Sequence, residues 1–325
     1  MNTHHKLGRT VLRLGLGAAL VLSVGAARAD DEGVSIEEMF APAFESNMGA
    51  PASRVGMATR GIAPDADKQK RSLIWEADGY AKAQPGVSGG ALKQKALQAA
   101  KTAAFESAKA FLDGQGGAAS APYRFPQPGA AGVKVLQVTD HGMGADGRYH
   151  VWIKGELSYL LDQQQSEASM KNAAGPLSVR VWTERKRYRQ GEQVVVNLQG
   201  NRDFHARVFT ILSNGAVLQL APNAQRKSDL FDGGLVHQLP DMMLNEEFRL
   251  TVAPPFGEDR ILVFASEKPL ADIATKPAGQ GLSLFPGTGE QLRTLSRRLM
   301  GGAGATGNGG AELVEAEWRF ATTAR

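Results

Sequence analysis

From Gly175 onward the sequence repeats one short pattern, which limits the fold more than any other feature. Apolar and polar residues alternate over short runs, and each run ends at a turn signal such as Asn214-Gly215 or Pro254-Pro-Phe-Gly257. Alternation buries one side of a strand, and Gly, Pro and Asn end it. The run Ile261-Leu-Val-Phe-Ala265 is apolar throughout, as expected of a central strand. We therefore predict an antiparallel β-sandwich over residues 175–325.

Residues 72–161 carry a different pattern, which predicts a small α+β domain. A loosely alternating strand at Leu73–Ala81 precedes a helix at Ala91–Asp113, whose Ala and Leu residues recur at spacings of three and four. Two further strands follow, one from Val133 and one at Tyr149–Ile153. The order strand, helix, strand, strand places the helix on one face of the sheet.

The whole chain is thus predicted to be α+β with two domains. The predicted segments are a signal peptide at 1–29, a weakly ordered arm at 30–71, the α+β domain at 72–161, a polar linker at 162–174 and the β-sandwich domain at 175–325. Within the sandwich domain, leucine spacing predicts one helix at 288–300, and a closing strand at 312–321 is expected to return to the sandwich sheet.

Residues 1–29 have the features of a secretory signal peptide. Three basic residues precede the apolar run Leu14–Val24, and Ala27-Arg-Ala29 is a small-x-small cleavage site. As a helix this run would cover roughly 16 Å, too short for a hydrocarbon core of about 30 Å. We expect cleavage near Ala29/Asp30 and a periplasmic product; an uncleaved amphipathic anchor is the alternative.

The composition excludes several classes of function. The chain has no cysteine, which excludes disulfides, thiolate metal sites, cysteine nucleophiles and lipidation at a cysteine. Its formal net charge of +4 is accounted for by residues 1–29, which hold four basic residues and no acid. The exported remainder is neutral, and we expect no nucleic-acid partner. No later stretch approaches 18 apolar residues, so we expect no transmembrane segment in the mature chain.

Familiar catalytic and cofactor motifs are absent from the sequence. It contains no G-x-S-x-G elbow, no S-x-x-K motif and no P-loop. The histidines outside the signal peptide have no metal-ligand spacing; they are His141, His150, His205 and His237. The adjacent acids Glu246-Glu247 and Glu258-Asp259 would point to opposite faces of a strand, and we interpret them as solvated turns. We expect no catalytic residue, no cofactor and no metal.

One basic run is a candidate binding surface. The candidate partner-binding patch consists of Arg185, Lys186, Arg187, Tyr188 and Arg189. It could meet an anionic lipid head group or a polyanionic glycan. The alternative is structural: Tyr188 would cap the sandwich, and the charges would form a solvated edge that protects an exposed strand from aggregation.

A series of landmarks occurs in order between about residues 177 and 270. They are Tyr188-x-x-Gly191-Glu192, Asp203-Phe-His-Ala206, Asn214-Gly215, Leu220-Ala-Pro-Asn223, Gly233-Gly234, Pro240, Pro255-x-Gly257 and Ser266-x-x-Pro269. In this series the segment resembles the domain-of-unknown-function 4384 family. The resemblance implies a secreted or periplasmic β-sandwich and no known chemistry.

A second resemblance covers about residues 72–160. Glu76-Ala-Asp-Gly-Tyr80, the Ala-rich helix and the Val133–Ile153 hairpin carry it. In these features the segment is similar to the small domain of flagellar assembly protein T and of related outer-membrane lipoproteins. The chain departs from the lipoproteins because it has no cysteine to lipidate.

These observations favour a protein without catalytic activity. We expect an exported binding or assembly accessory protein of the bacterial cell envelope, with another envelope protein as its partner. A more specific form of this hypothesis is a role in assembling flagellar or secretion machinery. The alternative is a periplasmic hydrolase or glycan-binding protein. That alternative needs acids and histidines that converge in a cleft, for example His205 or His237 facing an acid.

The basic patch can be tested without disturbing the fold. Replacing Arg185, Lys186, Arg187 and Arg189 together with Ser is expected to leave folding intact, because these side chains belong to a solvated edge in either interpretation. Thermal unfolding followed by circular dichroism checks the fold, and capture of envelope components checks binding. Unchanged capture by the quadruple variant would remove the patch from consideration.

Overall fold

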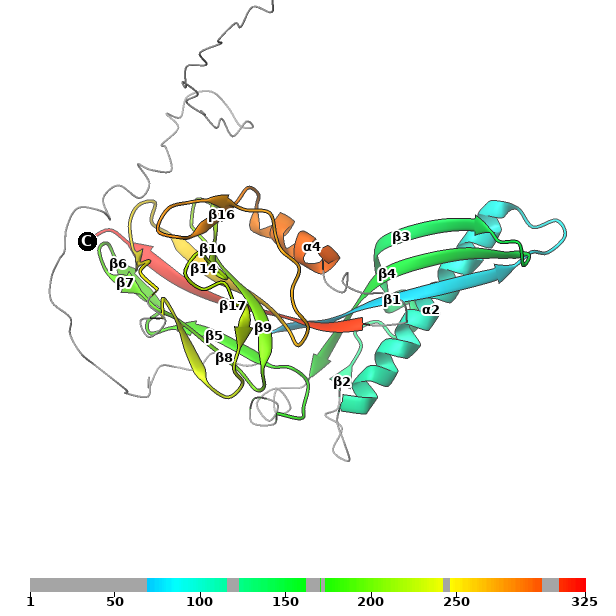
Figure 1. The fold of residues 1–325 in the computed structure, drawn as a ribbon, viewed down its shortest axis with the longest axis horizontal. Helices are drawn as coiled ribbons and strands as arrows, with labels where there is room; N and C mark the ends of the chain where they lie inside the picture. The colour runs from blue at the N-terminus through cyan, green and yellow to red at the C-terminus, as the bar shows by residue number, and fades with distance from the viewer. Residues whose placement is uncertain (1–68, 116–122, 162–169, 171–172, 242–245, 300–309) are drawn as a thin grey trace, which may run out of the picture.

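The computed structural model describes residues 69–115, 123–161, 170, 173–241, 246–299 and 310–325. The predicted signal peptide at 1–29 lies outside the described residues. So do nearly all of the predicted arm at 30–71 and most of the predicted linker at 162–174. The described part is an α+β fold built on antiparallel sheets, with one helix on the amino-terminal sheet and one near the carboxyl end, as the sequence predicts (Figure 1).

The amino-terminal layer is a helix on a sheet of four strands, one of which has only two residues. Its elements are β1 (Lys70–Lys82), α2 (Gly89–Gln115), β2 (Tyr123–Arg124), the 3-10 turn η4 (Gly129–Gly132), β3 (Lys134–Met143) and β4 (Arg148–Leu161). β4 pairs with β1 along nearly its whole length and with β3 on its other side. Helix α2 covers one face of these strands (Figure 1), and its alanines pack on Leu73, Ile153 and Leu157.

The remaining elements form the β-sandwich. Its first strands are β5 (Val179–Thr183), β6 (Arg187–Arg189), β7 (Gln193–Val194), β8 (Val196–Gly200), β9 (Phe204–Ile211), β10 (Val217–Ala221) and β11 (Leu230–Phe231). Then follow β12 (Val236–Leu239), β13 (Leu250–Thr251), β14 (Glu258–Ser266), β15 (Lys276–Pro277), β16 (Ser283–Phe285), α4 (Gly289–Leu299) and β17 (Gly310–Thr323). The small sheets β12-β8-β5 and β13-β7 face the large sheet β15-β16-β10-β9-β14-β17.

The last strand joins the two parts into one sheet, which the sequence did not predict. β17 pairs antiparallel with β14 over Val314–Ala321, as expected of a strand that returns to the sandwich. Its first half, Gly310–Glu315, pairs with β1 at Lys70–Trp75. Val314 and Glu315 therefore have a neighbouring strand on both sides. The amino-terminal layer and the sandwich share one continuous sheet, with β1 and β17 side by side where they meet (Figure 1).

Buried ion pairs hold α4 against the junction of the two parts. Arg297 Nε donates to Glu156 Oε1 of β4 at 2.7 Å, and its Nη2 donates to Glu315 Oε2 of β17 at 2.8 Å. Arg293 Nε donates to Glu315 Oε1 at 2.7 Å. Glu156 and Glu315 are almost fully buried, so water screens these ion pairs little. Loss of one partner would leave an uncompensated buried charge. Helix α4 thus fixes β4 relative to β17.

The opposite face of the junction is also polar and is held by hydrogen bonds. The Arg71 guanidinium donates to the Leu177 carbonyl oxygen and, at 2.8 Å, to Ser178 Oγ. Glu312 accepts from the Tyr159 hydroxyl and, at 3.1 Å, from the Leu177 N–H. Burial raises the pKa of the Glu312 carboxyl. These bonds tie the segment that leads into β5 to both β1 and β17.

One glycine permits the close contact between α2 and β1. A Cβ atom on Gly79 would lie 2.0 Å from the Ala96 carbonyl oxygen, which no relaxation of a side chain can relieve. We expect Gly79→Ala to lower the free energy of unfolding by about 1–3 kcal/mol through overpacking. Urea unfolding measures this.

Gly90 supplies the matched control. It lies in α2, the helix that packs on Gly79, with open space around its Cβ position, so Gly90→Ala should be neutral or stabilise by up to about 1 kcal/mol. Equal stability of Gly79→Ala and Gly90→Ala would contradict the contact.

Candidate functional site

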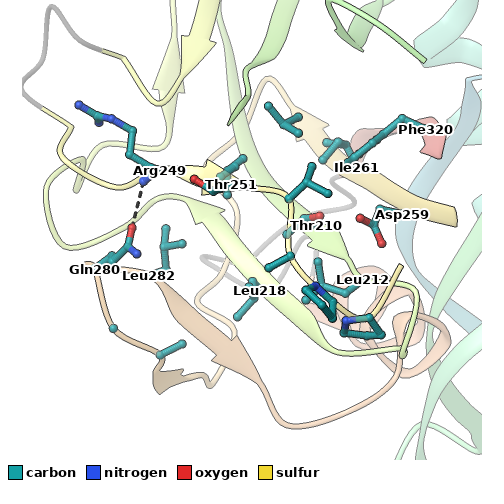
Figure 2. Close-up of a pocket in the computed structure, with 18 residues that line it drawn as sticks. Thr210, Leu212, Leu218, Arg249, Thr251, Asp259, Ile261, Gln280, Leu282 and Phe320 are labelled. Carbon is teal, nitrogen blue, oxygen red and sulfur yellow. Dashed lines mark hydrogen bonds between the residues drawn. The ribbon is translucent and has the colours of Figure 1, made fainter. Parts of the chain in front are cut away.

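A mostly apolar cavity of about 110 Å³ opens at one end of the sandwich. It lies between the β7–β13 ribbon, strands β9, β10, β14 and β17 of the large sheet, and the loop before β16 (Figure 2). Its apolar walls include Val194, Leu212, Leu218, Ile261, Leu282 and Phe320. Thr210 and Asp259 contribute polar atoms to this lining. A concave apolar site with few polar groups is the usual form of a ligand pocket.

Strand alternation places Asp259 in the cavity. On β14, Ile261, Val263 and Ala265 all face the sandwich core, and Asp259 occupies the next position of the same row. It is 7% exposed. Our interpretation of Glu258-Asp259 as a solvated turn is therefore wrong for Asp259. The sequence shows two adjacent acids but not which one the strand turns inward.

The second acidic pair also contains a buried member. Glu246 is almost fully buried, and its Oε2 accepts a hydrogen bond from the Asp241 N–H at 2.7 Å. Burial raises the pKa of the Glu246 carboxyl. The interpretation as a solvated turn is therefore wrong for Glu246 as well. It holds its own loop in place and does not line the cavity.

The Asp259 carboxyl has hydrogen-bond donors but no cationic partner among the described residues. Its Oδ1 accepts from the Ser213 N–H at 2.7 Å, and the Thr322 hydroxyl also interacts with it. Burial outweighs these bonds and raises the pKa of Asp259 to about 6. The cause is desolvation, which disfavours the charged form. A carboxyl with such a shift inside a cleft is a candidate functional group.

The one basic residue that lines the cavity is directed elsewhere. Arg249 Nη1 donates to the backbone carbonyl oxygens of residues 246–248. The backbone N–H of Arg249 donates to Gln280 Oε1 at 3.0 Å. In Figure 2 its guanidinium points away from the cavity, at the end opposite Asp259. Arg249 therefore shapes the rim and leaves the carboxyl unpaired.

The candidate partner-binding patch covers the short edge strand β6 and the two residues before it. Tyr188 is buried against Phe320, and its hydroxyl accepts from the Arg185 N–H at 3.1 Å. It supports the fold and offers no surface to a partner. Arg185 pairs with Glu192 at 2.9 Å, and the Lys186 ammonium lies 4.9 Å from the Trp318 ring centroid.

Arg187 and Arg189 remain exposed on β6, which pairs in parallel with the end of β17. The turn that follows β6 contacts the rim of the cavity, because the Gly191 N–H donates to the Val252 carbonyl oxygen at 2.9 Å. The exposed basic side chains of the patch are therefore anchored close to the cavity rim.

The histidines form pairs outside the cavity. His205 Nδ1 lies 2.8 Å from Asp229 Oδ1, and His150 Nε2 lies 2.6 Å from Asp78 Oδ1. His237 Nε2 meets the backbone oxygen of Asp232 at 2.9 Å. No serine or threonine hydroxyl in the described part of the chain is hydrogen-bonded to any of these rings. Over the same residues, no group of three or more His, Asp or Glu could hold a metal.

The landmark residues support loops rather than chemistry. Asn223 Oδ1 accepts from the Gln225 and Arg226 N–H groups, both within 2.8 Å. Asp203 Oδ1 accepts from the Gly233 N–H at 2.7 Å. A Cβ atom on Gly233 would lie 2.2 Å from the backbone of Arg202. These landmark residues therefore stabilise loops of the sandwich, and they do not line the cavity.

Comparison with known proteins assigns part of the sandwich. Residues 187–269 match the family described as Domain of unknown function (DUF4384), which confirms the first resemblance. No curated protein matches the chain, and no solved structure matches it. The match spans β6 to β14 and so includes Asp259 and much of the cavity lining. Among the described helices, none is long and apolar enough to cross a membrane.

The raised pKa of Asp259 makes stability depend on pH in a defined direction. The folded-state pKa of about 6 lies above the ordinary value of 3.8, so between these values the folded protein holds a proton that the unfolded chain has lost. The stability that the neutral carboxyl gives is complete below pH 3.8 and is lost as the pH rises through 6. Asp259→Asn cannot ionise. We expect its free energy of unfolding, relative to the parent protein, to rise by roughly 2–3 kcal/mol between pH 4 and pH 8.

Urea unfolding at both pH values measures this difference. Glu258→Gln is the matched control, because Glu258 is the exposed neighbour on the same strand. A constant difference between Asp259→Asn and the parent protein at the two pH values would show that Asp259 has an ordinary pKa.

Proposed function

We propose that this protein is an exported, non-catalytic binding or assembly accessory of the bacterial cell envelope, and that it holds a group of its partner in the sandwich cavity. The observation that carries the proposal is the cavity itself. Its walls are mostly apolar, and among the described residues that line it there is a single carboxyl and no histidine to pair with that carboxyl or to activate a hydroxyl. Such a site can bind a side chain or small ligand but lacks the paired groups that acid–base or nucleophilic catalysis needs.

Export is the part of the proposal that rests on sequence. Residues 1–29 combine a basic start, a short apolar run and a small-x-small site, and the chain has no cysteine for a lipid anchor. This combination supports cleavage near Ala29/Asp30 and a periplasmic location. The exposed charges of the candidate partner-binding patch, beside the cavity rim, support a peripheral contact with an anionic envelope surface. A flagellar or secretion-machinery role depends on the resemblance of residues 72–160 alone.

The alternative, a periplasmic hydrolase or glycan-binding protein, has one observation in its favour. His205 faces an acid, Asp229, at hydrogen-bond distance. This pair does not line the cavity, and no hydroxyl nucleophile in the described part of the chain completes it. A histidine–aspartate pair without a nucleophile stabilises a loop more readily than it performs hydrolysis. We therefore favour the binding function.

Blocking the cavity tests this function. The tagged full-length chain is captured from cross-linked envelope fractions as the parent protein, as Ala278→Trp and as Ala274→Trp. Ala278 lines the cavity, whereas Ala274 is exposed and does not. We expect an envelope component that the parent and Ala274→Trp retain and that Ala278→Trp loses, because the indole occupies the space of the bound group.

Two results would contradict the proposal. One is that a folded, periplasmic bait enriches no envelope component. The other is that Ala278→Trp, with unchanged thermal unfolding, captures the same components as the parent. Either result would move attention to glycan-binding and hydrolase assays.

A further inference from the structure

The cavity has an electrostatic imbalance that its own residues do not correct. A buried carboxylate without a cation is costly, because burial removes water and supplies no opposite charge. Among the described residues, Asp259 accepts a hydrogen bond from the Ser213 N–H and interacts with the Thr322 hydroxyl, and no cation is paired with it. A ligand that brought a positive charge to this end of the cavity would recover that cost.

The nearby charged side chains are committed to other partners or lie on another face. Glu258 and Arg260 flank Asp259 on β14, so alternation directs them away from the core. On the neighbouring β17, Arg319 pairs with Glu258 at 3.1 Å and with Glu317 at 2.7 Å. Arg249, on the far rim, is held by backbone carbonyl oxygens. None of these cations is directed at the Asp259 carboxyl.

The rest of the cavity fits an aliphatic chain. Its volume of about 110 Å³ is somewhat below the roughly 150 Å³ of a cavity that holds benzene, which suits a chain of about four carbons. Lysine side chains bury their methylene stems along apolar surface and keep the ammonium group on a polar partner. The walls of Val194, Leu218 and Leu282 would contact such a stem.

The polar end suits an ammonium better than a guanidinium. Thr210 of β9 lies directly opposite Ile261 of β14. Asp259 is two residues before Ile261, so it lies on the same face of the sheet and diagonally across from Thr210. Figure 2 shows the hydroxyl of Thr210 and the carboxyl of Asp259 at the same end of the cavity. A compact ammonium with three donors can reach both oxygens. A guanidinium needs a planar pair of acceptors, and Oδ1 of Asp259 is already engaged by Ser213.

We infer that the cavity receives a lysine side chain of a partner protein, with its aliphatic stem along the apolar walls and its ammonium group paired with Asp259. This inference rests on the proposed function, in which the cavity is the binding site, and it names the group that is bound. The apolar walls supply contact area, and the single carboxylate supplies the preference for a cation.

Matched small probes test the inference on the protein purified from the periplasm. n-Butylammonium imitates the lysine side chain, and n-butanol has the same length without the charge. Binding is followed by the amide chemical shifts of Ser213 and Leu282. Near pH 8 we expect n-butylammonium to bind about tenfold more tightly than n-butanol, as one charge-assisted hydrogen bond provides.

The pH dependence and two variants identify Asp259 as the counter-ion. With a pKa of about 6, lowering the pH from about 8 to about 4.5 should weaken n-butylammonium about tenfold, to the level of n-butanol, and leave n-butanol unchanged. Asp259→Asn should abolish the preference for the cation while n-butanol still binds. Glu258→Gln should keep the preference, because its carboxyl lies outside the cavity.

The possible failures are distinguishable. If neither probe shifts the Ser213 and Leu282 signals, the cavity is not a binding site, and the proposed function fails together with the inference. If n-butanol binds as tightly as n-butylammonium near pH 8, or if Asp259→Asn keeps the preference, the lysine inference is overturned and the proposed function stands.

Discussion

Strand β17 has two sets of neighbours, and the rest of the structure depends on this double pairing. Its first half completes the sheet of β1 and β4, and its second half lies beside β14 in the sandwich. An unpaired backbone group in the interior is costly, so the junction is stable only when both neighbours are present. The ion pairs from Arg293 and Arg297 to Glu315 then hold α4 over the same segment. A continuous sheet with charged groups paired on both faces fixes the amino-terminal layer relative to the sandwich.

The same frame explains where binding is possible. The junction is filled by side chains that form many hydrogen bonds and ion pairs, as Arg71 and Glu312 illustrate. The opposite end of the sandwich is different, because the short β7–β13 ribbon covers the large sheet only in part and leaves the apolar cavity. Burial there raises the pKa of the unpaired Asp259 carboxyl to about 6, so it takes up a proton at a higher pH than an ordinary aspartate does. Stability is thus concentrated at the junction, and binding capacity lies at the far end.

The sequence landmarks inside the segment that matches DUF4384 and the candidate site involve different residues. Landmarks such as Asn223 and Gly233 hold loops through backbone hydrogen bonds and close packing. Asp259 lies between the landmarks Pro255-x-Gly257 and Ser266-x-x-Pro269 and belongs to neither. The loop framework and the cavity are therefore separate features of this sandwich, and the fold alone does not identify a ligand.

The sequence by itself determined the classes of element. Alternating runs and turn residues predicted the sandwich strands, and the spacing of alanines and leucines predicted α2 and α4 close to their observed bounds. Those patterns are local, so one segment contains all the information they need. Tertiary structure alone decided that β17 also pairs with β1, that Tyr188 is buried, and that Asp259 rather than Glu258 enters a cavity. Each of these depends on which distant strand lies alongside, and on register, where a shift of one residue exchanges the inner and outer faces.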